Sequence, residues 1–175
     1  MILILEGVDG SGKTTLATKL MAAKLFDGYI HVSNPEPGED VFWHHFYPAR
    51  SAGSGDIVDR LHWSDDVYGA VLRGGPGLTP QQFGFIDGFM ASRGAVMVLC
   101  SPPLHVVLAN IDKEPDGKNH NDSTAMRVWD EYQAPTRSVL PVLTYDYTTD
   151  PAAAALIKEL MVLRLDQATV DGSSL

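Results

Sequence analysis

The chain has 175 residues, of which 45% are hydrophobic and 20% are charged, a composition typical of a folded globular protein rather than a disordered or fibrous one. This length supports a hydrophobic core without disulfides or structural metals, so we predict a single domain over residues 1–175. The net charge of −9 argues against binding to nucleic acid or to an anionic membrane, and the single cysteine, Cys100, excludes an internal disulfide and is consistent with a cytoplasmic protein.

The chain begins with a continuous aliphatic run, residues 1–5, which is typical of a strand buried on both faces of a parallel sheet. Glu6 interrupts the run too early for a membrane span, and no basic leader precedes it, so we expect neither a signal peptide nor a transmembrane helix. A glycine-rich stretch follows, and residues 14–25 then carry leucines at helical spacing. The unit is predicted to be strand, loop and helix.

The glycine-rich stretch, GVDGSGKT at residues 7–14, matches the phosphate-loop pattern G-x-x-x-x-G-K-[ST]. In such a loop the backbone N–H groups and a helix N-terminus face one concavity, and side chains would obstruct the phosphates. We expect Lys13 to reach the outer phosphates of ATP and the Thr14 hydroxyl to bind Mg²⁺. The predicted phosphate-binding residues are Gly7, Asp9, Gly10, Ser11, Gly12, Lys13, Thr14 and Thr15.

Residues 29–32 are predicted to form a second, short strand, whereas residues 40–50, DVFWHHFYPAR, show no clean periodicity and receive no assignment. The aromatic residues of this stretch either stack on a nucleobase or cover the core under a long loop. The adjacent histidines His44 and His45 would point apart and have no partner at ligand spacing, so we reject a zinc site.

The remaining elements alternate along the chain, which predicts a three-layer α/β fold of the P-loop NTPase type, with a parallel sheet of about five strands flanked by helices. The expected strands are residues 56–60, 95–100 and 142–147, and the expected helices are residues 61–72, 79–92, 104–111, 126–140 and 152–165. Residues 112–122 hold no apolar side chain, and we interpret this segment as a lid that supplies Lys113 and Lys118.

Two short stretches test whether the phosphate loop belongs to a GTPase. Residues 66–69 formally match the D-x-x-G motif, but we place them inside a helix and not at the end of a strand. Residues 110–113 contain the residues of a guanine-recognition motif in the wrong order. The sequence therefore disfavours a GTPase.

Three segments resemble thymidylate kinases. The string LEGVDGSGKTTL is similar to the phosphate loop of that family, and residues 58–64, VDRLHWS, look like its strand-end Asp-Arg motif with a serine four residues after the arginine. Residues 36–38, Glu-Pro-Gly, match the end of its Arg-Glu-Pro-Gly loop. The segments occur in the family's order and span about a third of the chain, from the phosphate loop to the Asp-Arg motif.

The resemblance implies roles for several residues. Asp9 would contact the acceptor sugar or orient an arginine, Arg60 would hold the acceptor 5′-phosphate, and Asp59 would help to organise Mg²⁺ together with Thr14. Lys13, Asp59, Arg60 and Asp9 are therefore the expected catalytic residues, and the expected acceptor-binding residues are Asp9, Arg60, Ser64, Tyr68 and Arg73. For Tyr68 and Arg73 an ordinary core tyrosine and a solvated arginine are equally good interpretations.

Two departures from the family affect the acceptor. Pro35, preceded by Asn34, occupies the place of the family's arginine before Glu-Pro-Gly, so one phosphate contact is either missing or replaced by Arg50 or Arg73. The lid also lacks the arginine with which related kinases stabilise the transition state.

The resemblance implies a transferase that uses ATP and Mg²⁺ to phosphorylate a deoxynucleoside monophosphate, dTMP or a related pyrimidine, in nucleotide biosynthesis. Two alternatives stay open: a kinase acting on a deoxynucleoside or on a modified base in DNA, and a regulatory protein that binds nucleotide without catalysis. The missing arginine favours the first of these, and the net charge opposes its DNA version. The sequence is also compatible with a homodimer.

Overall fold

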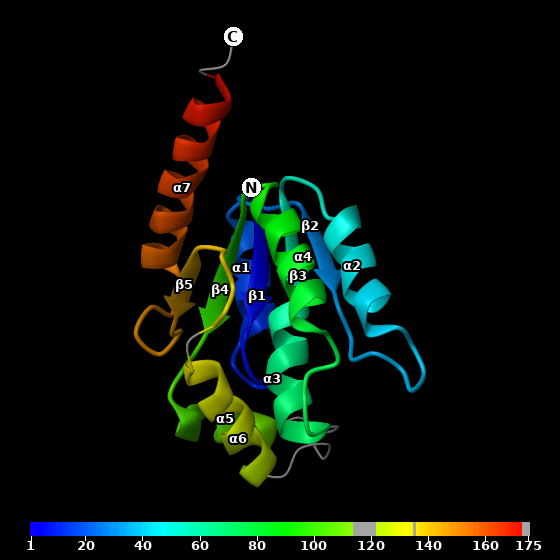
Figure 1. Cartoon of the computed structure of the whole chain (residues 1–175). Coiled ribbons are helices and arrows are strands. Elements are labelled where there is room, and N and C mark those ends of the chain that lie inside the picture. The colour runs from blue at the N-terminus through cyan, green and yellow to red at the C-terminus, as the bar shows by residue number, and fades with distance from the viewer. Residues whose placement is uncertain (114–121, 135, 173–175) are drawn as a thin grey trace.

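The computed structural model describes residues 1–113, 122–134 and 136–172, and it contains a five-stranded sheet in which all neighbouring strands are parallel. The strand order is β2-β3-β1-β4-β5, so the first strand lies at the centre (Figure 1). The strands are β1 (Ile2–Glu6), β2 (Gly28–His31), β3 (Asp56–Asp59), β4 (Ala95–Cys100) and β5 (Val142–Tyr145). The predicted α/β fold with a sheet of about five parallel strands is confirmed.

Helices cover both faces of this sheet, so that the sheet is the middle one of three layers (Figure 1). The helices of the described residues are α1 (Lys13–Ala22), α2 (Val41–Ser51), α3 (His62–Leu72), α4 (Pro80–Ala91), α5 (Leu104–Ile111), α6 (Asp122–Gln133) and α7 (Ala154–Gly172). Two separate cores lie between the layers: one packs α1 and α7 against the sheet, and the other packs α3, α4 and α6 against the opposite face.

The alternation within β1 explains why its sequence is apolar from Ile2 to Leu5. Leu3 and Leu5 belong to the core beneath α1, whereas Ile2 and Ile4 belong to the core beneath α3 and α4. Every residue of β1 and of β4 is buried, because the central strands of a two-sided parallel sheet expose neither face. The C-terminal ends of these strands meet at one edge of the sheet, where ligands of open α/β sheets bind.

The unassigned residues 40–50 form most of helix α2. Asp40 caps this helix by accepting a hydrogen bond from the backbone N–H of Trp43. The helical period is hidden in the sequence because Trp43 and Tyr47 are exposed aromatic residues on the outer face, where a polar residue would normally mark the pattern.

The expected helix over residues 126–140 is wrong at both ends, because α6 begins at Asp122 and ends at Gln133. Beyond it, the backbone N–H of Val139 and the hydroxyl of Ser138 donate to the buried carboxylate of Asp87, which fixes this stretch as an irregular connection to β5. Helix α7 runs farther than expected, to Gly172. Within the described residues no helix is long and apolar enough to cross a membrane.

Candidate functional site

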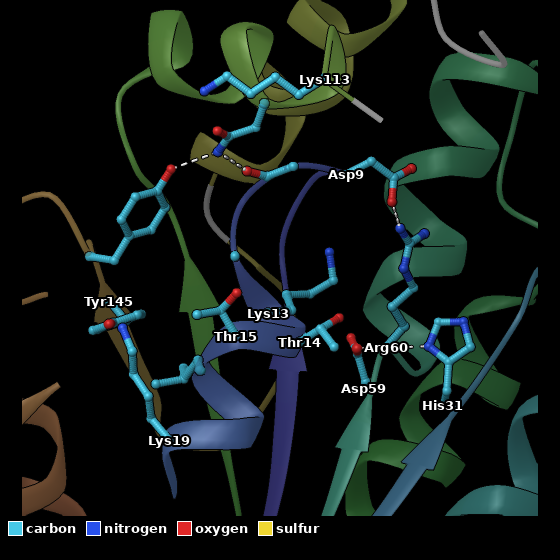
Figure 2. Close-up of a pocket in the computed structure, with 15 residues that line it drawn as sticks. Asp9, Lys13, Thr14, Thr15, Lys19, His31, Asp59, Arg60, Lys113 and Tyr145 are labelled. Carbon is cyan, nitrogen blue, oxygen red and sulfur yellow. Dashed lines mark hydrogen bonds and ion pairs between the residues drawn. The ribbon is translucent and has the colours of Figure 1, made fainter. Parts of the chain in front are cut away.

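A pocket of about 500 Å³ lies at the C-terminal edge of the sheet, above β1 and β3 and beside the first turn of α1 (Figure 2). Its wall combines the loop that follows β1 with the ends of β2, β3, α5 and β5. The predicted residues that line it are Asp9, Gly10, Gly12, Lys13, Thr14, Thr15, Asp59, Arg60 and Lys113. The predicted lid residue Lys118 lies outside the described residues, as do residues 114–121 of the expected lid.

The loop before α1 needs glycine for its backbone shape. Gly12, the residue that precedes α1, has a φ of 88°, and Gly10 has a φ of 75°, values that favour glycine over any other residue. Gly7 has a φ of 141°, and a Cβ atom there would lie 2.5 Å from the carbonyl oxygen of Cys100. The motif therefore encodes both the left-handed turns of the loop and its close approach to β4.

Lys13 is buried with its ammonium group against the loop. Its Nζ donates to the carbonyl oxygens of Gly7, at 2.8 Å, and Val8, at 3.0 Å. Burial, assisted by the positive charge of Arg60, lowers the pKa of Lys13 despite the nearby carboxylates. An anion that replaces the carbonyl contacts strongly stabilises the charged form of a lysine desolvated in this way.

Asp59, at the end of β3, is a buried carboxylate in which one oxygen accepts a hydrogen bond and the other has no hydrogen-bond partner among the described residues. Its Oδ2 accepts a hydrogen bond from the Tyr29 hydroxyl and lies 3.7 Å from Nδ1 of His31, both on the neighbouring strand β2. Burial and the hydrogen bond to Asp59 raise the pKa of Tyr29 to about 12, so this hydroxyl keeps its proton. Oδ1 of Asp59 has no hydrogen-bond partner among the described residues.

The donor set around Asp59 suits a hard cation such as Mg²⁺. Asp59 and Thr14 line the same pocket, and Mg²⁺ is commonly held by one or two protein oxygens together with phosphate and water. In the described part of the chain no three His, Cys, Asp or Glu residues cluster in a way that could hold a metal. Phosphate oxygens would therefore have to complete the coordination.

Asp9, Arg60 and Tyr68 form one contact network beside this pocket (Figure 2 shows the pair of Asp9 and Arg60). The Arg60 guanidinium pairs with the Asp9 carboxylate and lies 4.9 Å from the centre of the Tyr68 ring. The Tyr68 hydroxyl donates to Asp9 Oδ2 at 3.2 Å. Burial lowers the pKa of Arg60, but the neighbouring Tyr68 and Asp9 outweigh it and raise the net value. Of the two roles expected of Asp9, the structure displays contact with the arginine.

Arg60 also lines a second, narrower cleft between the end of β2, helix α2 and helix α3. The cleft measures only about 10 Å³, which is room for about one water molecule. Its lining residues are Val32, Ser33, Asn34, Pro35, His45, Arg60, Ser64, Asp65, Tyr68 and Arg73. The structure thus brings four of the five residues expected at the acceptor together here, and Arg60 stands between this cleft and the phosphate-loop pocket.

Ser64 is tied to a buried carboxylate that the sequence analysis did not single out. The Ser64 hydroxyl donates to Glu6 Oε2, and Glu6 Oε1 accepts from the backbone N–H of Leu61 at 3.0 Å. Tyr132 of α6 donates to Glu6 at 3.1 Å. Glu6 therefore fixes the start of α3 to the central strand, and the signal for it was an acidic residue at the end of a buried aliphatic strand.

Arg73 is held in the cleft by Asp65, another buried carboxylate. The guanidinium of Arg73 pairs with Asp65 Oδ1, while Oδ2 accepts the backbone N–H groups of Gly77 and Leu78 at 2.9 and 3.0 Å. Of the two arginines considered as replacements for the one missing before Glu-Pro-Gly, Arg73 therefore lines the cleft. Arg50, the other replacement considered, is exposed near the end of α2 and lines neither pocket.

Two predicted phosphate-loop residues, Gly7 and Ser11, lie behind the pocket wall. Ser11 is completely buried, and its hydroxyl has no hydrogen-bond partner among the described residues. The aromatic residues considered for base stacking also line neither pocket: Phe42 and Phe46 pack against the core, and Trp43 and Tyr47 face outward. Covering the core was therefore the better of the two interpretations for Phe42 and Phe46.

Asn110 and Tyr147 complete the pocket and were not predicted. The side-chain amide of Asn110 donates to the carbonyl oxygen of Gly10 at 2.9 Å and to the Tyr147 hydroxyl at 2.7 Å. The Tyr147 ring lies so close to Gly12 that a Cβ there would be 3.1 Å from it. Because α5 and the loop after β5 are far from the motif in sequence, no local pattern could reveal this contact.

The fold occurs in several solved nucleotide-binding proteins. YorR from Bacillus subtilis, in a complex with phosphorylated GDP, superposes with a TM-score of 0.78 at 21% identity over 96% of this chain and 98% of its own. Deoxyadenosine kinase from M. mycoides superposes with TM-scores of 0.59 with bound dATP, at 12% identity, and 0.55 with bound dCTP, at 15% identity. Both kinase comparisons cover 95% of this chain and 100% of the kinase chain.

At these identities the likeness establishes that the chain shares the α/β fold of these two proteins. No protein-family model and no curated protein sequence matches the chain.

Proposed function

We propose that this protein is an Mg²⁺-dependent phosphotransferase that moves the γ-phosphoryl group of ATP to a deoxynucleoside monophosphate, with dTMP or a related pyrimidine nucleotide as the acceptor. The observation that carries the proposal is the position of Arg60, which lines both the phosphate-loop pocket and the narrow cleft. A residue so placed contacts both substrates when ATP occupies the pocket and the acceptor occupies the cleft. We therefore assign Lys13, Asp59, Arg60 and Asp9 to catalysis.

In this reaction the bond between the γ-phosphorus and the β,γ-bridging oxygen breaks, an acceptor oxygen bonds to phosphorus, and ADP leaves. The chain contributes position and charge, because phosphoryl transfer needs little covalent help from the protein. Lys13 and the loop N–H groups bind the phosphates of ATP, and Arg60 orients the acceptor. Mg²⁺, held by Thr14 and Asp59, would neutralise the phosphate charge.

Lys113 belongs to the segment that we predict to be a lid. Among the described residues of that segment it is the cation that lines the pocket. We propose that it faces the outer phosphates and partly replaces the arginine that related lids provide. A lysine is a compact point charge and not a planar fork, so it neutralises charge without fixing orientation.

A deoxynucleoside acceptor is a second candidate, and the charges of the narrow cleft favour it. Arg60 is paired with Asp9, and Arg73 is paired with Asp65. A phosphate dianion in this cleft would have to displace a carboxylate from a guanidinium, whereas a neutral 5′-hydroxyl would not. The non-catalytic alternative has no comparable support, since a protein that only binds nucleotide needs no second cleft next to the phosphates.

The acceptor is identified by a panel of purified compounds. The four deoxynucleosides, their 5′-monophosphates and a modified-base oligonucleotide are each incubated with the protein and ATP-Mg²⁺, and ADP formation is measured. We expect consumption of ATP with a monophosphate. Turnover confined to the free nucleosides would select the second candidate, and ATP binding without transfer to any compound would contradict both.

A homodimer is the remaining proposal, and the exposed aromatic face of α2 and α4 is the surface that supports it. Trp43, Tyr47 and Phe85 are 44%, 59% and 56% exposed, and Phe85 contacts the inner aromatic residue Phe46 of α2. Beside Phe85 on α4, the space next to Gly84 is open, so the Phe85 side chain of a second copy would have room to pack there in a twofold contact. Sedimentation should detect a dimer that Phe85→Asp abolishes; an unchanged dimer in the variant would overturn this surface.

A further inference from the structure

His45 is a buried imidazole for which the fold provides no hydrogen bond. It is 3% exposed, it lies on α2, and neither of its ring nitrogens has a hydrogen-bond partner among the described residues. Its nearest acidic atom is Oδ1 of Asp65, at 3.9 Å from Nε2, which is too long for a hydrogen bond. Burying a polar side chain without a hydrogen-bond partner lowers the stability of the folded protein, so its presence calls for a reason.

The neighbouring histidine shows that this lack of partners is specific to His45. His44 has the same chemistry and lies on the same helix, yet its ring contacts the Glu39 carboxylate at 2.9 Å and the carbonyl oxygen of Ser33 at 2.8 Å. The two rings are nearly perpendicular, with an angle of 87° between their planes. The two histidines therefore have different positions. His44 binds the loop after β2, and His45 lines the narrow cleft that this loop helps to form.

Asp65, the carboxylate nearest to His45, does not complete a hydrogen bond with the His45 ring. Asp65 is occupied, because it already accepts hydrogen bonds from Arg73, Gly77 and Leu78. Burial raises the pKa of Asp65, but the nearby His45, Arg73 and the N–H of Leu78 outweigh it and hold the pKa below its ordinary value. Asp65 therefore stays ionised and serves as the anchor that aims Arg73.

Resting on the proposed function, we infer that His45 and Arg73 read the hydrogen-bonding edge of the acceptor's nucleobase. Arg60 and Asp9 mark the end of the cleft next to the phosphate-loop pocket, so the reacting end of the acceptor lies there and His45 and Arg73 are left for the base. Arginine offers only N–H donors, which suit a carbonyl oxygen, and a neutral imidazole offers one donor and one acceptor. Thymine, uracil and guanine present a carbonyl next to an N–H group, whereas adenine has no carbonyl.

The cleft must widen before a base can enter, since it now has room for about one water molecule. Its outer wall is the loop of Ser33, Asn34 and Pro35, whose first two residues are exposed. The hydrogen bond from His44 to Ser33 holds this wall in place. Loss of that bond changes the entry of every acceptor alike, whereas loss of the His45 ring changes the choice between acceptors.

The test compares His45→Phe, which fills the volume without hydrogen bonds, with His45→Gln, which restores a donor and an acceptor. His44→Phe is the matched control. For each protein, kcat/KM is measured with thymine, uracil, guanine and adenine acceptors, as deoxynucleosides and as monophosphates. We expect wild type to prefer the carbonyl bases over adenine, and His45→Phe to reduce that ratio about tenfold, which corresponds to the loss of one hydrogen bond. His45→Gln and His44→Phe should keep most of the ratio, with KM for ATP unchanged.

An equal fall for all four bases in His45→Phe, with the ratio of wild type, would overturn the inference and leave His45 a packing residue. If His45→Phe does not fold, the wild-type protein with labelled histidines decides the matter. The ring resonances of His45 should then shift when thymidine or dTMP is added and not when deoxyadenosine is added, and no shift at saturation would overturn the inference. Failure of the proposed function would appear differently, as an absence of ATP turnover with every acceptor.

Discussion

The phosphate-loop pocket and the narrow cleft meet at Arg60 but are built from different parts of the chain. The pocket is formed largely by backbone, with glycines at φ values of 75° and 88° and a lysine that rests on the loop's own carbonyls. The cleft is formed by side chains whose charges already pair with one another, Arg60 with Asp9 and Arg73 with Asp65. Under the proposed function, the first arrangement would bind the phosphates of a nucleoside triphosphate without reading its base, and the second would distinguish one acceptor from another.

The largest expected effect lies on the pocket side. Lys13→Ala removes the one loop side chain that is poised to exchange carbonyl contacts for phosphate, so we expect turnover with ATP and the best acceptor to fall by about 10³-fold. Steady-state assays measure this, with Lys158→Ala, an exposed lysine on α7, as the control for loss of a positive charge. Near-normal rates in a folded Lys13→Ala protein would sink the proposed function.

This pocket was predictable because its chemistry leaves a local signature. Positive φ values, close backbone approach and a helix N-terminus each demand a residue type at a fixed spacing, so Gly7, Gly12, Lys13 and Thr14 could be identified without a structure. Asp59 and Arg60 were identified through the resemblance to the Asp-Arg motif of thymidylate kinases, and the structure places them at the end of β3 and directly after it.

The cleft was predictable only in part, because its contacts join residues that are distant in sequence. Arg73 was weighed equally as a solvated residue, and only the fold shows that Asp65, eight residues earlier in the chain, holds Arg73 in the cleft. His45 was rejected as a zinc ligand and then left without a role. Aromatic residues on both faces of α2 concealed the helical period that would have shown which histidine points inward.

The second prediction tests the claim that the cleft depends on a buried, ionised carboxylate. Asp65→Asn should lower the free energy of unfolding at pH 7 by about 2 kcal/mol, because it weakens the charge-assisted hydrogen bonds that the buried carboxylate accepts from Arg73, Gly77 and Leu78. The pKa of Asp65 is lowered in the folded protein, so its stabilising contribution is present above the ordinary value of about 3.9 and is lost as the pH falls through the lowered pKa. The difference between wild type and variant in urea unfolding should therefore shrink progressively as the pH falls below about 3.9.

Asp66 provides a matched control with the opposite sign. Burial raises the pKa of Asp66 even though Arg137 lowers it, and this ion pair is partly exposed. A raised carboxyl pKa stabilises the folded state below the ordinary value and loses that contribution as the pH rises. Asp66→Asn should change stability by less than about 1 kcal/mol at pH 7. If both variants showed the same magnitude and pH dependence, the cleft would not depend specifically on Asp65.

The smallest expected effect separates the two regions kinetically. Asn110→Ala removes the amide that joins the Gly10 carbonyl to the Tyr147 hydroxyl, so the phosphate loop loses a brace without losing a phosphate contact. Loss of such a brace should raise KM for ATP about tenfold, equivalent to about 1.4 kcal/mol, and leave KM for the acceptor and the preference among bases unchanged. Tyr147→Phe, which keeps the ring against Gly12 but removes the hydroxyl, should show a weaker form of the same change. A change in acceptor KM as large as that for ATP would mean that this contact also shapes the cleft. The pocket and the cleft would then not be separate sites for ATP and the acceptor.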